Sequence, residues 1–136
     1  MRMPSLRRLP AESRDRGSAP VEFVLVGTLL TLVTVSVLQL ALALHVRSTL
    51  IDAAAEGARH AALADSSLVA GVERSRDLIS TAVGESYAAD IAAGFGSYEG
   101  QPVVVVTVRS PLPLIGLAGF DGTLEVSGRA ALEPLR

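Results

Sequence analysis

The hydrophobic positions of this chain form one long uninterrupted run, followed by shorter stretches in which apolar residues recur with helix or strand spacing. The run, Phe23–Leu44, contains 22 residues and no charge. As a helix it spans about 33 Å, which matches the roughly 30 Å hydrocarbon core of a bilayer. The rest of the chain is too small to enclose so long an apolar helix, which disfavours a buried helix of a soluble protein. The run therefore predicts a transmembrane helix.

The charges before this run predict its orientation. Five arginines precede Gly17, against two acids; they are Arg2, Arg7, Arg8, Arg14 and Arg16. An excess of arginine marks the cytoplasmic side of a membrane segment, so we expect a cytoplasmic N-terminus and an exported C-terminal part. The chain then divides into a basic leader at 1–17, a transmembrane segment at 18–44 and an exported domain at 45–136.

A cleaved secretory signal peptide is an alternative interpretation of the same segment. Ala41-Leu42-Ala43 has the small-residue pattern that signal peptidase cuts. Two observations count against it. The apolar run is longer than the usual signal-peptide core of about 7–15 residues, and the helical pattern continues beyond the cut without a break.

Residues 45–64 continue the helix with a face of small side chains. Leu50, Ala54, Ala58 and Ala61 share this face. Small residues at four-residue intervals let another helix approach closely. The face either packs on its own domain or contacts a neighbouring subunit, and the two interpretations can hold along different stretches.

The remaining sequence predicts a second helix and a small sheet. Asp65-Ser66-Ser67 favours a turn and a helix N-cap, and the apolar stripe after it predicts an amphipathic helix over 68–87. Strands are expected at 103–109, at 123–132 and at about 91–98. Glycines 94, 96 and 100 are expected to break regular structure. The predicted fold class is α+β, with a long N-terminal transmembrane helix, a second amphipathic helix and a small antiparallel sheet.

The turn region between 111 and 122 is unusually apolar for a loop, with Leu112, Leu114, Ile115, Leu117 and Phe120. We expect it to cover the sheet, touch the membrane or meet a partner.

Composition argues against several classes of function. The chain has no cysteine, which excludes disulfides, thiolate zinc sites and cysteine nucleophiles. A net charge of -2 and few aromatic residues argue against nucleic-acid binding. Glu56 and His60 are four residues apart, but two ligands do not make a metal site. No set of nucleophile, base and orienting group is evident, so we expect no catalytic residue, no metal, no cofactor and no enzyme.

The most informative local pattern is Gly17-Ser18-Ala19-Pro20-Val21-Glu22-Phe23, which leads directly into the apolar run. A carboxylate at the edge of a membrane segment is costly and indicates a function. Glu22 can protonate, reach the headgroups, or pair with the α-amine of a neighbouring subunit that has been cut before Ser18. In the last case Ser18 can cap the first turn, and Glu22 fixes the register between subunits.

At these residues the chain resembles the prepilins and pseudopilins of type IV-like pili, and most closely the TadE-like pseudopilins of the tight-adherence (Flp-type) pilus. In these families a basic leader ends in glycine and a glutamate lies five residues beyond the cut, where Gly17 and Glu22 stand. Phe23 follows the glutamate as in the tight-adherence branch. The stretch Glu56-Gly57-Ala58-Arg59, just outside the membrane, adds to the resemblance, which covers Gly17 to about Ala62 well.

The resemblance implies a pilin-like fold and a minor pseudopilin of a pilus or secretion apparatus, in the cytoplasmic membrane of a bacterium. It implies that a prepilin peptidase cuts between Gly17 and Ser18, that Glu22 and Phe23 set the assembly register, and that Glu56–Arg59 is a helix contact motif. The implied partners are other pseudopilins, the major pilin and the pilus assembly platform. Two alternatives stay open: a secreted small binding domain with a cleavable signal peptide, and an uncleaved single-pass membrane scaffold.

Overall fold

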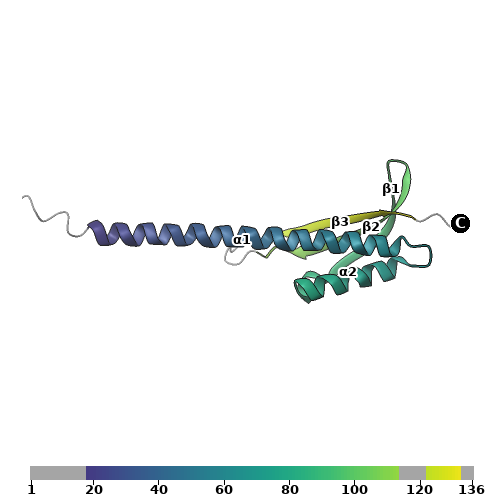
Figure 1. Cartoon of the computed structure of the whole chain (residues 1–136), viewed down its shortest axis with the longest axis horizontal. Helices are drawn as coiled ribbons and strands as arrows, with labels where there is room; N and C mark the ends of the chain where they lie inside the picture. The colour runs from purple at the N-terminus through teal and green to yellow at the C-terminus, as the bar shows by residue number, and fades with distance from the viewer. Residues whose placement is uncertain (1–17, 114–121, 133–136) are drawn as a thin grey trace, which may run out of the picture. The chain divides into compact units, whose positions relative to one another are not determined.

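The computed structural model of the chain describes residues 18–113 and 122–132 (Figure 1). Its elements are α1 (Ser18–Ala61), α2 (Leu68–Ala82), a short 3-10 helix η1 (Glu85–Tyr87), β1 (Asp90–Tyr98), β2 (Gln101–Pro111) and β3 (Thr123–Ala131). The predicted α+β class, with a long N-terminal apolar helix, a second helix and a small antiparallel sheet, is confirmed. The leader, including Gly17, and the apolar residues Leu114, Ile115, Leu117 and Phe120 of the turn region lie outside the described residues.

The chain divides into two compact units, with the boundary between Leu38 and Gln39. The N-terminal unit, residues 1–38, contains the first part of α1. The C-terminal unit, residues 39–136, contains the rest of α1, together with α2, η1 and the sheet. The finer division at residues 17 and 44 stays a prediction.

The three strands form one antiparallel sheet in the order β1-β2-β3. Val105 of β2 lies opposite Gly94 of β1 and Arg129 of β3. Residues opposite one another point to the same side of a sheet, so this register defines an outer face that carries these three residues. The inner face carries Val104, Val106 and Val108, which are completely buried.

The core of the C-terminal unit lies between this inner face and the helices. Leu50 of α1 and Ile79 of α2 are completely buried in one cluster with Val106 and Val108. Figure 1 shows α2 alongside the C-terminal part of α1, with strands of the sheet behind them. Each large apolar side chain buried here stabilises the fold by about 1.5–3 kcal/mol, which makes this cluster the main favourable contribution to folding.

The strand predicted at about 91–98 is confirmed as β1, but the two glycines within it do not interrupt it. Gly94 and Gly96 were expected to break regular structure, and this is wrong: both lie inside β1, opposite Val105 and Val103. Their neighbours on β2 are β-branched and hold the pairing in place. Gly100 does reverse the chain, since Glu99 (φ 49°) and Gly100 (φ 79°) form a two-residue hairpin loop with positive φ, as in type I′ turns.

The second helix is shorter than the predicted 68–87. It ends at Ala82, where Val83 leaves the helical region with φ -131°, although its N–H still donates to the carbonyl of Ile79. Gly84 follows with φ 111°, a conformation that favours glycine and ends the helix. The residues from Glu85 to Tyr87 form the separate helix η1.

Ser67→Ala is expected to lower the free energy of unfolding by about 1 kcal/mol. As predicted, Ser67 is the N-cap of α2, and its side-chain oxygen accepts a hydrogen bond from the N–H of Ala70 at 3.2 Å. Without it, that N–H at the helix end loses its protein partner. Chemical unfolding of the full chain in detergent, followed by circular dichroism, measures the change. Ser66→Ala is the matched control; equal losses in both variants would contradict the capping role.

Candidate functional site

The N-terminal unit presents an apolar helix without protein around it. Every large hydrophobic side chain between residues 18 and 38 is exposed, from 45% for Val35 to 80% for Phe23. The most apolar window of α1 has a mean hydropathy of 2.2, and in the described part of the chain α1 is the one helix long and apolar enough to cross a membrane. A continuous apolar surface of this length is unfavourable in water, so it fits a single-pass membrane segment.

Four hydroxyl groups of this segment are satisfied within the helix. The hydroxyls of Thr28, Thr31, Thr34 and Ser36 each donate to the carbonyl oxygen four residues earlier, at 2.8 Å. These bonds spare the hydroxyls from lying unpaired in hydrocarbon, so they do not oppose membrane insertion.

Glu22 lies near the start of α1, one turn from Ser18, the first residue of the helix. Residues four apart share a helix face, so the side chains of Ser18 and Glu22 lie on the same side of α1. Within residues 18–113 and 122–132, no hydrogen bond or ion pair includes Glu22. Processing at Gly17 and Ser18, and register-setting by Glu22 and Phe23, stay predictions.

In the C-terminal unit, α1 and α2 approach so closely that glycine is required on both. A Cβ on Gly57 would lie 2.6 Å from the carbonyl oxygen of Gly71 and would collide with Oγ of Ser75. A Cβ on Gly71 would in turn lie 2.6 Å from Cβ of Ala61. The Ser75 hydroxyl donates to the carbonyl of Ala53 at 3.0 Å, a buried hydrogen bond that links the two helices.

The same stretch of α1 also packs directly on β3. A Cβ on Gly128 would collide with backbone atoms of Ala54 and Ala55. Of the two interpretations of the small-residue face, packing on its own domain therefore holds for Ala54 and for Gly57, Ala58 and Ala61, which are buried. Glu56 and Arg59 stay partly exposed, and contact of the Glu56–Arg59 motif with another subunit stays a prediction.

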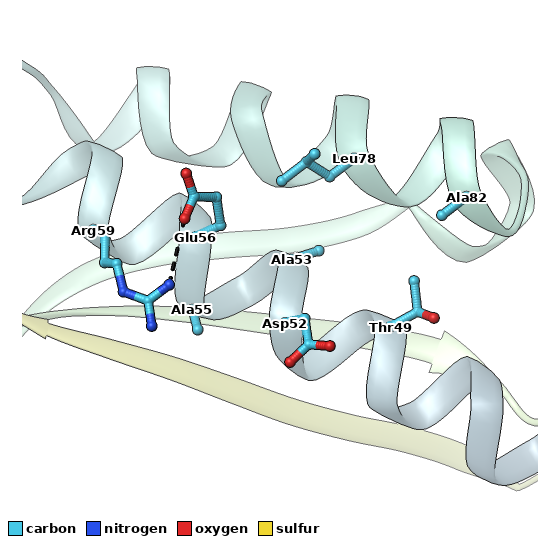
Figure 2. A pocket seen from close by; sticks show the side chains of 8 residues that line it. All are labelled: Thr49, Asp52, Ala53, Ala55, Glu56, Arg59, Leu78 and Ala82. Carbon is cyan, nitrogen blue, oxygen red and sulfur yellow. Dashed lines mark hydrogen bonds and ion pairs between the residues drawn. The ribbon is translucent and has the colours of Figure 1, made fainter.

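A groove of about 450 Å³ runs beside α1 and α2 (Figure 2). Figure 2 shows that α2 lines it with apolar side chains and α1 with both polar and small apolar ones: Leu78 and Ala82, then Thr49, Asp52, Glu56 and Arg59 with Ala53 and Ala55. Two of these side chains form an ion pair, with Nη1 of Arg59 3.3 Å from Oε2 of Glu56. Among the described residues no group of three or more His, Asp or Glu side chains could hold a metal. The groove is therefore mostly apolar, with polar side chains of α1 on one side only.

The outer face of the sheet carries polar contacts at both ends. Arg109 Nε donates to Glu125 at 2.7 Å, and Arg109 Nη1 lies 4.0 Å from a carboxylate oxygen of Asp90. The hydrogen bond and negative charge of Glu125 raise the pKa of Arg109 above its usual value. At the other end, the Arg129 guanidinium lies 5.5 Å from the centre of the Tyr98 ring, a cation–π contact. Together these contacts link all three strands.

Comparison with known protein families gives a match for the N-terminal part of the chain. The model of the family described as TadE-like protein matches residues 17–59. The chain carries a TadE-like domain. This domain begins at Gly17, includes Glu22 and Phe23 and ends at Arg59, so it contains every predicted site residue, and the resemblance found in the sequence is confirmed. No curated protein and no solved structure matches the chain. A TadE-like domain suggests a protein associated with the Tad pilus.

Several residues of the TadE-like domain's packing were missed in the sequence. The predictions identified the face of small residues on α1. They did not identify the residues that pack against it, which are Gly71 and Ser75 of α2 and Gly128 of β3. A signal existed for Gly71, because glycine inside a helix costs about 1 kcal/mol relative to alanine and often marks close packing. Gly128 gave no such signal, since a strand glycine is compatible with a bulge, a bend or a close contact.

Proposed function

We propose that this protein is a minor pseudopilin, a structural and assembly subunit of a tight-adherence type IV-like pilus or secretion apparatus. The observation that carries the proposal is the TadE-like match over 17–59, which coincides with a helix whose apolar part has no protein cover. The packed C-terminal unit supports a structural role, because its helices and sheet bury one another through small residues.

The apolar part of α1 holds the subunit in the cytoplasmic membrane, with the C-terminal unit on the exported side. A prepilin peptidase removes the leader after Gly17, which leaves a free α-amine on Ser18. On assembly with other pseudopilins and the major pilin, the apolar helices pack side by side. The Glu22 carboxylate of one subunit then pairs with the α-amine of a neighbour. Such a pair is strong at low dielectric and is sensitive to distance, so it selects one axial register.

Co-expression with a prepilin peptidase is expected to yield a mature protein that begins at Ser18. Intact mass and N-terminal sequencing of the membrane fraction measure this directly, and a catalytically inactive peptidase is the control. The product should stay in the membrane pellet after a carbonate wash, because the apolar part of α1 is retained. A protein that still begins at Met1 would favour the uncleaved scaffold. A product that begins after Ala43 and is washed free would favour the secreted binding domain.

A further inference from the structure

The strand β1 is an edge of the sheet and lacks the features that usually protect an edge. It has nine residues, pairs with β2 without a bulge, and carries neither proline nor charge after Asp90. Natural edge strands are blunted by lysine, proline, bulges or short length, because their free N–H and C=O groups otherwise recruit another strand. An edge of this length therefore offers a ready site for strand addition.

Packing within the chain does not require a glycine at position 94 of β1. A Cβ there would meet no atom within 4 Å. Glycine in a strand is nevertheless less stable than alanine by about 0.5–1 kcal/mol, and it marks places where another backbone approaches closely. Ala92 and Gly96 lie on the same outer face as Gly94, so this face of β1 carries three small residues in a row.

The inner side of β1 carries an exposed aromatic ring, and the opposite edge of the sheet carries a hollow. Phe95 is 70% exposed. A hollow of about 320 Å³ lies between the end of α1 and the end of β3, lined by Arg59, Ala62, Leu63, Arg129, Ala130 and Ala131. Phe95 lies opposite Val104, which lies opposite Ala130, so the ring and the hollow are level on one face of the sheet.

We propose that the C-terminal units of two copies join edge to edge, with β1 of one copy pairing in parallel with β3 of the next and Phe95 entering the hollow of the next copy. Both strands run antiparallel to β2 and therefore parallel to each other. A second copy in the same orientation thus brings its β3 beside β1. The contact is heterologous, because it joins two different edges, so it can repeat from one copy to the next.

The direction of α1 selects this pairing over its simplest rival. In the parallel arrangement the C-terminal part of α1, which follows the apolar segment, begins on the same side of both copies, as it must when both chains are anchored in one membrane. An antiparallel pair of two β1 strands around a two-fold axis would reverse α1 in one copy.

The sheet register also matches the two edges. A copy displaced sideways places the stem of its Arg129 beside Gly94, where no Cβ competes for the space, and places Ser127 beside Ala92. The same displacement places Glu125 of the neighbour beside Asp90, so two carboxylates lie next to each other across the contact. Each is already paired with Arg109 of its own copy, which limits their repulsion.

Disulfide cross-linking of the full chain in membrane vesicles tests the pairing, because the natural chain has no cysteine. Ala92→Cys and Ser127→Cys in one chain are separated by β2, about 9.6 Å, which is too far for a disulfide within a copy. On mild oxidation the double variant is expected to give a ladder of dimers and larger species. Each single variant should give at least tenfold less, and the two single variants expressed together should give dimers only.

The control pair is Ala92→Cys with Thr81→Cys, which places the second thiol on α2. Phe95→Ser or Leu63→Ser, added to the double variant, should lower the ladder at least fivefold, with an unchanged unfolding midpoint as the check on folding. Dimers from Ala92→Cys alone, an equal ladder from the control pair, or an unchanged ladder in both serine variants would overturn the proposal. None of these readouts depends on cleavage at Gly17, so failure here and failure of the proposed function are separate results.

Discussion

Gly128→Val is expected to lower the unfolding midpoint of the C-terminal unit by roughly 12–24 °C, which corresponds to about 3 kcal/mol for a domain of this size. The reason is the direct contact between β3 and α1. The first added carbon collides with backbone atoms of Ala54 and Ala55, and backbone in the middle of a helix cannot rotate away as a side chain can. Thermal unfolding of the full chain in detergent, followed by circular dichroism, measures the shift.

Gly94→Val is the matched control, since it also adds a β-branched side chain to a strand glycine. No atom lies within 4 Å of a Cβ at this position. We therefore expect a midpoint within a few degrees of the natural chain, or slightly above it, because valine favours strands. If both variants unfolded at the same temperature, the close packing of β3 on α1 would not be the reason that position 128 requires glycine.

Glu22→Ala is expected to lower co-assembly with partner pseudopilins at least tenfold while leaving membrane insertion unchanged. The apolar run is untouched, so carbonate extraction should still leave the protein in the pellet. The substitution removes the carboxylate that pairs with the α-amine of a neighbouring subunit, so assembly loses this ion pair. Glu22→Gln keeps the size and removes the charge, and it should fail equally. Glu22→Asp keeps the charge on a shorter arm and should retain part of the assembly. Co-purification from detergent-solubilised membranes measures the yield.

If Glu22→Gln co-assembled normally, the negative charge of Glu22 would not be needed for assembly, and the proposed pairing would be wrong. A second check is stability: since Glu22 lies in the N-terminal unit, none of the three variants should change the unfolding midpoint of the C-terminal unit. A lowered midpoint would attribute the assembly defect to folding.

Features that depend on neighbours within about four residues could be predicted from the sequence. The Ser67 cap, the Glu56–Arg59 pair and the hydroxyl bonds of the apolar helix are of this kind, and the structure has all of them. The strands were also predicted because β-branched runs and alternation are local patterns. The membrane segment needed only length and hydropathy.

Features that depend on contacts distant in sequence could not be predicted. Gly94 and Gly96 looked like breaks because nothing in their own stretch shows that valines of β2 lie opposite them. The early end of α2 depends on Gly84, whose positive φ is a property of the folded chain. The Arg109–Glu125 contact needs the register of β3 on β2, since sixteen residues separate the pair.

The long helix α1 imposes two different limits on amino-acid replacement. Around Gly27, where a Cβ would meet nothing within 4 Å, folding of the single chain constrains only the apolar character of the surface. Around Gly57, side-chain volume is the constraint, and even one methyl group is too much. For folding alone, one continuous helix should therefore tolerate changes of side-chain shape in its first part and almost none in its last, so that shape constraints in the first part would report contacts with other subunits.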